Sequence, residues 1–417
     1  QFHPEVRHTE HGQKILENFV FGICGAEKNW NMENMKDDII ANIKKTVGGR
    51  NVFVLVSGGV DSGVAFALLT QALGPDRVYG LYIDTGFMRL NESDEIKASL
   101  AAAGFKNLHI LDASNTFYER LKGIVDPEEK RKIIGQAFLD AKDEQAKKLN
   151  LNPDEWMLGQ GTIYPDTIET GGTKHADTIK THHNRVDAIQ KLIAQGKVIE
   201  PIADFYKDEV RKIGDLLRLP KEMIQRHPYP GPGLAIRILC HDPASSNTQL
   251  PATKYQLLPI RSVGVQGDNR TYAHPVVLTR EADWESLDEE ASRITNKEKE
   301  INRALLLLNE QKEPAEFRLP NAPKTLTPDR ISLLQNIDAI VHEEIKQAGL
   351  YNEIWQFPVV LIPVGLKHFE SIILRPVASQ EAMTASFYRM PHDVLKSITQ
   401  KIMATGAIDY VFYDITN

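Results

Sequence analysis

The clearest chemical signal in the chain is a short glycine-containing loop, Ser57–Ser62, with the sequence SGGVDS. It follows the apolar run Val52–Val56, typical of a buried strand, and leads into Asp61–Leu73, whose composition predicts a helix. Two adjacent glycines let the backbone approach a ligand closely, and the amides converge where the helix begins. Such a nest at the positive end of a helix suits phosphate or pyrophosphate. The alternative is an ordinary strand–helix turn capped by Ser or Asp.

The aspartate in this loop indicates a metal ion. Asp61 would repel phosphate oxygens directly, and a Mg²⁺ ion between the carboxylate and the phosphates removes that repulsion. The loop is not a Walker A motif, because no Gly-Lys-Ser/Thr sequence follows it. The loop therefore predicts a nucleotide phosphate site with Asp61 as a magnesium ligand.

Alternating strand and helix signals surround the loop and must position it. Short apolar strands separated by helices predict an α/β fold with a parallel sheet covered on both faces. Right-handed crossovers then bring the strand ends and their loops to one edge, where ligands bind. The predicted strands are Val52–Val56, Val78–Ile83, Leu108–Leu111 and Glu155–Leu158, and the predicted helices include Glu92–Ala103 and Pro127–Leu149.

The pattern changes after His227–Gly233, a proline-rich segment that predicts a stiff, exposed loop. Beyond it, two apolar runs that contain proline each open a strand–helix unit, which predicts a duplicated α+β domain with repeats at about 255–310 and 355–417. The predicted elements are strands Leu257–Val263, Val276–Leu278, Val359–Val364 and Ser371–Pro376, and helices near Ser292–Leu308 and Val394–Met403.

Composition excludes several classes of function. A formal net charge of −7 argues against a general nucleic-acid-binding surface, although local basic clusters can hold phosphates. The only two cysteines, Cys24 and Cys240, make neither a disulfide framework nor a metal-ligand set. No apolar run is long enough to cross a bilayer, so we expect a cytoplasmic enzyme without membrane contact.

The loop resembles the signature of the ATP pyrophosphatases, which split ATP between its α and β phosphates. Together with six further motifs in order, it resembles the GMP synthase family over nearly the whole of residues 1–240. This resemblance implies an adenine-nucleotide α-hydrolase-like domain. The motifs are Ile83–Arg89, Gln160–Glu169, Ile179–Asn184, Glu200–Ile202, Phe205–Arg211 and Arg226–Gly233.

The resemblance implies that ATP adenylates XMP at the purine O2, and that ammonia from glutamine then replaces the activated oxygen to give GMP, AMP and pyrophosphate. Lys207 would offset charge on the departing pyrophosphate, although a solvated lysine is the ordinary reading of such a residue. Neighbouring histidines rarely chelate one ion, so zinc is not expected at the lid. The implied ATP-binding residues are Ser57, Gly58, Gly59, Val60, Asp61, Ser62 and Asp84, and the implied catalytic and lid residues are Asp61, Lys207, Asp166, Glu169, Lys180, His182 and His183.

The second domain carries its own resemblance. Ile260–Arg270 is similar to the nucleotide-contacting segment of the family's dimerisation domain, although a hairpin-tip turn would otherwise explain Asp268 and Arg270. The duplication is similar to the eukaryotic-type enzymes, in which an inserted copy stands in for a second subunit, so monomer and homodimer both remain open. The implied XMP contacts are Asp268, Arg270 and Gln356, with Arg226, Gly231 and Gly233 near the phosphate.

Both ends of the sequence resemble parts of larger units. His3-Pro4-Glu5 resembles the end of a class I glutamine amidotransferase domain, in which His3 and Glu5 would complete a triad with a cysteine other than Cys24. The chain stops at Asn417, just short of the Lys-Pro-Pro and Glu-Trp-Glu-like tail that closes on XMP in the family. The predicted division is residues 1–25 (amidotransferase remnant), 26–240 (ATP pyrophosphatase) and 241–417 (duplicated domain).

Two rival functions remain at this stage. Another ATP pyrophosphatase, such as an NAD synthetase, an argininosuccinate synthetase or a tRNA thiolation enzyme, would share a similar phosphate loop. A nucleotide-binding regulatory protein that has lost catalysis would bind ATP or XMP without releasing pyrophosphate.

Overall fold

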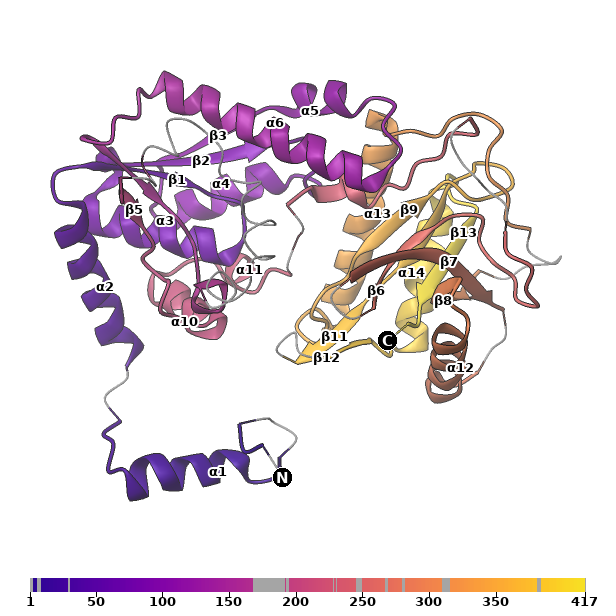
Figure 1. The fold of residues 1–417 in the computed structure, drawn as a ribbon, viewed down its shortest axis with the longest axis horizontal. Helices are drawn as coiled ribbons and strands as arrows, with labels where there is room; N and C mark the ends of the chain where they lie inside the picture. The colour runs from indigo at the N-terminus through magenta and orange to yellow at the C-terminus, as the bar shows by residue number, and fades with distance from the viewer. Residues whose placement is uncertain are drawn as a thin grey trace.

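Two β-sheets with their helices make up most of the molecule, shown as a computed structural model in Figure 1. A short helical segment, α1 (Gly12–Glu17) with the π-helix Asn18–Ile23, stands apart from both sheets. Among the described residues, no helix has both the length and the apolar character needed to cross a membrane. The structure describes residues 3–5, 9–28, 31–167, 192, 195–227, 229, 231–244, 250–266, 269–279, 282–309, 316–380 and 384–416.

The first sheet has five parallel strands in the order β3-β2-β1-β4-β5. The order reverses between β1 and β4, so the connection after β1 lies at a topological switch point, the usual place for a ligand in such sheets. The predicted α/β class is therefore confirmed. The strands are β1 (Asn51–Leu55), β2 (Val78–Asp84), β3 (Leu108–Asp112), β4 (Trp156–Gly159) and β5 (Val198–Ile199).

Helices cover this sheet for reasons that are visible in the sequence. Helix α3 (Val60–Leu73) is apolar on nearly every side because it is enclosed by the sheet and by helices α2 and α10. Helix α2 begins where the Asn31 side chain accepts a hydrogen bond from the Glu33 amide at 2.8 Å. The helices are α2 (Met32–Val47), α4 (Glu92–Ala102), α5 (Ser114–Leu121), α6 (Pro127–Lys148), α10 (Lys207–Leu216) and α11 (Lys221–Ile224).

The second sheet has six strands in the order β6-β7-β8-β13-β10-β9. The pairs β7·β8 and β10·β13 are parallel, both outer strands are antiparallel to their neighbours, and β8·β13 is the antiparallel central pair. The pattern is the same read from either edge, as a duplicated β-β-α-β unit would give. The strands are β6 (Ser262–Gln266), β7 (Asn269–Leu278), β8 (Ile301–Leu307), β9 (Val359–Ile362), β10 (Ser371–Leu374) and β13 (Tyr410–Asp414).

Helices α12 (Trp284–Lys297) and α14 (His392–Ala404) precede β8 and β13 and so occupy equivalent places in the two units. Helix α13 (Pro328–Gln347) lies between the units in the chain and faces the first sheet's half of the molecule (Figure 1). A two-stranded ribbon of β11 (Val377–Gln380) and β12 (Thr384–Phe387) completes the second unit.

Three expectations about this half of the chain are wrong. The predicted helix at Ser292–Leu308 ends at Lys297, and Ile301–Leu307 is strand β8, because burial in the centre of the sheet outweighs the helix propensity of its Ala-Leu run. The predicted strand at Leu257–Val263 is not continuous: Leu257 makes an isolated antiparallel bridge with Val276, and strand β6 begins only at Ser262. The proline-rich loop is not exposed throughout, since His227 is only 5% exposed.

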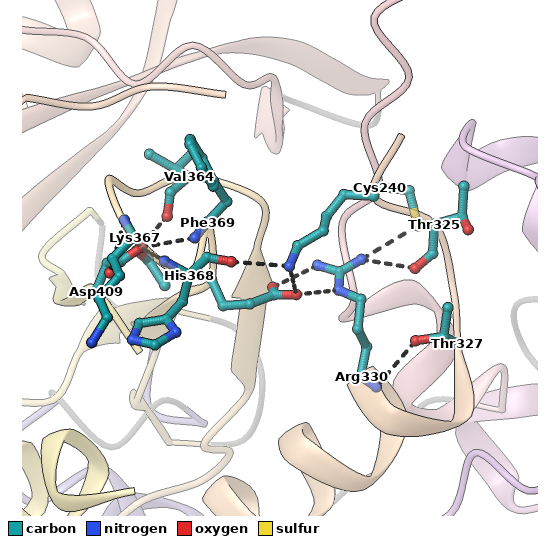
Figure 2. A network of polar contacts seen from close by, with 12 residues as sticks. Cys240, Thr325, Thr327, Arg330, Val364, Lys367, His368, Phe369 and Asp409 are labelled. Atoms are coloured by element: carbon teal, nitrogen blue, oxygen red, sulfur yellow. Dashed lines mark hydrogen bonds and ion pairs between the residues drawn. The ribbon is translucent and has the colours of Figure 1, made fainter. Parts of the chain in front are cut away.

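Helix α13 makes polar contacts with both halves of the molecule. Gln335 donates from Nε2 to the Met88 carbonyl oxygen at 2.9 Å, and Arg330 makes a two-pronged ion pair with Glu370 at 2.7 and 2.9 Å. Figure 2 shows the Arg330 guanidinium group reaching toward Cys240 in the segment that links the halves. These contacts tie helix α13 both to its own sheet and to the segment after β2.

Candidate active site

The Ser57–Ser62 loop is closed by its own hydroxyl groups. Ser62 Oγ accepts from the Ser57 amide at 3.0 Å and donates to the Gly59 carbonyl oxygen at 3.2 Å. Gly58 has φ +81°, a conformation that other residues rarely adopt, so the dihedral favours glycine, and a Cβ atom there would also displace Ile96 Cδ1, 2.6 Å away. Helix α3 then begins at Val60 with no side-chain cap. Its first amides are therefore available to a ligand.

The structure brings together two catalytic candidates that lie far apart in the sequence. Lys207 Nζ lies 3.3 Å from Asp61 Oδ2, with 44% of the lysine side chain exposed. The other oxygen, Asp61 Oδ1, is buried and has no hydrogen-bond partner among the described residues. Lys207 opens helix α10, whose start is held by the Glu209 carboxylate accepting from the Tyr206 amide at 2.9 Å. A cation and a carboxylate thus meet beside the loop.

The connection after β4 packs onto the same loop. A Cβ atom at Gly161 would lie 2.8 Å from the Ser62 backbone nitrogen, so only glycine permits this approach. Asp166 uses its Oδ2 atom to accept from the Ile163 amide at 3.2 Å, which holds the start of the predicted lid segment. The remaining lid candidates, Glu169, Lys180, His182 and His183, lie outside the described residues.

Asp84, at the end of β2, lies on the same sheet edge as the loop. Its Oδ1 atom accepts from the Gly86 amide at 2.8 Å, and its Oδ2 atom accepts from Ser93 Oγ at 2.5 Å. Both oxygens therefore shape the connection between β2 and α4. The predicted role of Asp84 in ATP binding stays a prediction.

Arg226 lies against the base of the phosphate loop. Its Nη1 atom is 3.1 Å from Glu92 Oε1 and 3.7 Å from where a Cβ atom of Gly58 would stand. Gly233 packs onto the connection after β2, because its φ is +62° and a Cβ atom would lie 2.3 Å from the Phe87 carbonyl oxygen. Gly231 is exposed. These three candidates thus lie on the first sheet's side of the molecule, and their predicted XMP contact stays a prediction.

The other XMP candidates belong to the second sheet. Arg270 pairs through its backbone with Val265 in the β6–β7 hairpin, and Asp268 lies outside the described residues. Gln356 accepts through its backbone oxygen from the Val377 amide at 2.7 Å. The structure therefore anchors the segments that carry these candidates, and the contact of Asp268, Arg270 and Gln356 with XMP stays a prediction.

The N-terminal candidates form a local pair. His3 Nδ1 lies 2.9 Å from Glu5 Oε1, and both side chains are exposed. A hydrogen bond from the backbone, followed by the contact with His3, lowers the pKa of Glu5. Cys24 is exposed at the end of the π-helix. The predicted amidotransferase origin of this segment stays a prediction.

Sequence reasoning missed Glu92, a residue that is 2% exposed and contacts both Arg89 and Arg226. Its Oε2 atom accepts from the Arg89 amide at 2.7 Å while its Oε1 atom faces Arg226. An acidic residue in the first turn of a helix is normally read as a capping residue. The position of Glu92 in the sequence therefore predicted only the start of helix α4, and not a contact near the phosphate loop.

The sequence was compared with known protein families and with known proteins. Residues 343–417 match the family described as GMP synthase C terminal domain. The chain is 49% identical to a probable GMP synthase (glutamine-hydrolyzing) of Leptospira interrogans over 100% of this chain and 71% of the relative. It is 35% identical to the GMP synthase (glutamine-hydrolyzing) of Dictyostelium discoideum, over 100% of this chain and 68% of that one. It is 42% identical to that of Aquifex aeolicus, over 100% and 66%. The chain belongs to the GMP synthase family.

Proposed function

We propose that this member of the GMP synthase family transfers AMP from ATP to the O2 atom of XMP and then replaces that oxygen with ammonia derived from glutamine. The xanthine C2 carbonyl is amide-like, and its oxygen leaves poorly as hydroxide. Attack of O2 on the α-phosphorus breaks the α–β bond of ATP and releases pyrophosphate. Ammonia then attacks C2, the C2–O2 bond breaks, AMP departs, and loss of a proton gives GMP.

The observation that carries this proposal is the contact between Lys207 and Asp61 at the Ser57–Ser62 loop. Splitting ATP between its α and β phosphates places negative charge on the departing pyrophosphate. The free amides at the start of α3 and the Lys207 ammonium group would offset that charge. The protein's main tasks are then positioning and charge stabilisation.

The residues present fit a Mg²⁺ ion. Asp61 Oδ1 is buried without a hydrogen-bond partner among the described residues, as expected of an oxygen reserved for a cation. No cluster of three or more His, Cys, Asp or Glu side chains with metal-site geometry occurs in the described part of the chain. Asp61 would therefore hold the ion together with substrate phosphates and water. When bound, the ion would neutralise charge on the phosphates.

The other assignments from the sequence form part of the same proposal. Asp84 would lie near the adenosine, the lid residues would cover the adenylate, and His3 and Glu5 would belong to a glutaminase unit that supplies ammonia. We also propose a cytoplasmic enzyme that acts as a monomer or as a homodimer through the duplicated domain. The proposed lid residues are Asp166, Glu169, Lys180, His182 and His183, the proposed XMP contacts are Arg226, Gly231, Gly233, Asp268, Arg270 and Gln356, and the proposed domains are residues 1–25, 26–240 and 241–417.

The products of ATP cleavage test the proposal. The chain is incubated with ATP, Mg²⁺, XMP and ammonium, and nucleotides and phosphates are separated chromatographically. We expect AMP, pyrophosphate and GMP in equal amounts, and no ATP cleavage without XMP. Formation of ADP and inorganic phosphate would refute the proposal, and binding of XMP without any cleavage would favour the regulatory alternative.

A further inference from the structure

Three arginines share two buried carboxylates where helix α13 meets the first sheet's half of the molecule. Arg89, after β2, places Nε 3.5 Å from Asp338 Oδ2, and Arg237 places Nη1 3.8 Å from Asp338 Oδ1. The second carboxylate belongs to Glu92, whose Oε1 atom lies 3.1 Å from Arg226 Nη1. Both carboxylate side chains are 2% exposed, so solvent screens their charge only weakly.

The ion pairs of Asp338 are held by charge and not by hydrogen bonds. Asp338 Oδ1, Arg237 Nη1, and the Nε and Nη2 atoms of Arg89 are buried, and none has a hydrogen-bond partner among the described residues. The guanidinium groups of Arg89 and Arg237 also both lie over the ring of Tyr229, 4.8 and 4.9 Å from its centroid. The positions of these two arginines therefore depend on the charges around them, and removal of one charge would shift them.

Both carboxylates act on both of these arginines. Burial disfavours the charged form of Arg89, but Asp338, and after it Glu92, hold its pKa above the usual value. Burial lowers the pKa of Arg237, and the same two carboxylates oppose this effect while the charge of Arg89 adds to it. Glu92 thus attracts Arg89 and Arg237 in addition to its own partner, Arg226.

The other ionisable groups at this junction change the balance little. His342 Nδ1 lies 2.8 Å from the Asp338 backbone oxygen, and burial lowers the pKa of both His342 and His227 to about 4, so both imidazoles are neutral at pH 7. Glu95 Oε2 lies 3.8 Å from Arg226 Nη2, but its side chain is 64% exposed and its charge is screened. The negative charge that the three arginines share therefore comes mainly from the two buried carboxylates.

Loss of the Asp338 charge would be felt at the phosphate loop. Both arginine partners of Asp338 would then compete for Glu92, because a buried cation without a counter-charge is costly. Glu92 is already within reach of one of them, since its Oε2 atom accepts from the Arg89 amide at 2.7 Å. Arg226 would lose part of its ion pair, and its Nη1 atom lies only 3.7 Å from where a Cβ atom of Gly58 would stand.

We propose that Asp338 is a positioning residue, which neutralises Arg89 and Arg237 from helix α13 and so leaves Glu92 to hold Arg226 at the base of the Ser57–Ser62 loop. This inference rests on the proposed function, in which Arg226 contacts XMP. It gives the second half of the chain a role in placing a residue of the first half, without any contact between Asp338 and a substrate.

The test is a double-mutant cycle on the full chain, with kcat/KM for XMP measured by pyrophosphate release. Asp338→Asn removes the charge and keeps the shape, and we expect it to lower kcat/KM roughly ten- to hundredfold, as misplacement of a distant positioning group can. Because the effect is exerted through Arg226, Asp338→Asn is expected to lower kcat/KM less than about twofold further in an Arg226→Met background. A residue that only stabilises the fold would cause the same loss in both backgrounds.

Glu344→Gln is the matched control, since it neutralises another buried carboxylate on the same helix. Glu344 contacts Ser397 and Lys401 on helix α14, away from the three arginines. We expect Glu344→Gln to be less stable than the wild type in urea unfolding, as Asp338→Asn is, and yet to keep kcat/KM for XMP within about twofold.

A conservative variant covers the case in which Asp338→Asn does not fold. Asp338→Glu keeps the charge and is expected to stay within about fivefold of the wild type, the difference reflecting the extra methylene group. A tenfold or larger loss in this variant would overturn the inference.

Additive losses in Asp338→Asn and Arg226→Met, or full activity in Asp338→Asn, would also overturn it. Failure of the proposed function is a separate result, because it would appear as absent AMP formation in the wild type. The cycle is then read from free energies of unfolding in urea, in which Asp338→Asn and Arg226→Met are still expected to be non-additive, and additivity there would overturn the inference.

Discussion

Replacement of Lys207 by alanine tests the proposed phosphate chemistry most directly. The substitution removes the cation that lies 3.3 Å from Asp61 Oδ2, at the mouth of the Ser57–Ser62 loop. Two unit charges about 4 Å apart interact by roughly 4 kcal/mol at an effective dielectric constant near 20. Because 44% of the lysine side chain is exposed, solvent reduces this interaction substantially.

Allowing for this screening, we expect Lys207→Ala to lose about 1.4–2.8 kcal/mol of transition-state stabilisation, or roughly 10- to 100-fold in kcat/KM for ATP. The assay follows XMP-dependent pyrophosphate release at saturating ammonium over a range of ATP concentrations. If Lys207 acts on charge that develops only during bond breaking, most of the loss falls on kcat and little on KM.

Lys212→Ala is the matched control. Lys212 lies on the same helix and is 62% exposed, and its contact is a surface ion pair with Asp208 at 3.7 Å. Its removal is expected to change kcat/KM less than twofold, as for other surface pairs. A Lys207→Ala variant that stays within twofold of the wild type would refute the assignment of Lys207 to pyrophosphate stabilisation.

Two further predictions concern fit and charge. Gly161→Ala would place a methyl group 2.8 Å from the Ser62 nitrogen and is expected to raise the KM for ATP at least about tenfold. The control is Gly135→Ala within helix α6, where an added Cβ atom meets nothing within 4 Å and KM is expected to stay unchanged. Equal KM values for the two variants in steady-state assays would contradict this. Burial raises the pKa of Asp414, but Arg303, Arg375 and Thr416 together hold it below 3.8. Its ionised form therefore stabilises the fold above about pH 4, and this stability is lost as the pH falls through the folded pKa. In urea unfolding, we expect Asp414→Asn to lower the free energy of unfolding at neutral pH and to lower it less below about pH 4. A loss of stability that does not depend on pH would refute this.

The phosphate loop was predictable because its determinants are local. A strand with a buried apolar centre, two glycines and the start of helix α3 follow one another directly in the sequence, and the structure has the same order. The proximity of Lys207 to Asp61 was implied only by the family resemblance, since nothing local joins residues 146 positions apart. Local sequence patterns predict individual helices and strands, whereas the order of strands in the sheet determines which of them lie next to each other.

The charged cluster of Arg303, Arg375 and Asp414 on the second sheet shows the same limit. Arg303 and Asp414 are 111 residues apart and meet because β8 and β13 pair as the central strands of the sheet. The sequence predicted β8 as the end of a helix, so the pairing that brings Arg303 to Asp414 could not be derived from it. Of these charged residues, Asp414 ends strand β13 and Arg375 directly follows β10, whereas Arg303 lies within β8.

Duplication gives the second sheet two equivalent connections, β6–β7 and β9–β10, but the chain uses them differently. In the β9–β10 turn, the Asp409 carboxylate accepts from the amides of Leu366, Lys367, His368 and Phe369 at 2.8–3.4 Å (Figure 2). These amides could otherwise bind an anion, so a side chain of the same unit closes this turn. The two copies therefore differ: a side chain closes the β9–β10 turn of the second unit, whereas the β6–β7 hairpin of the first unit carries the proposed XMP contact Arg270.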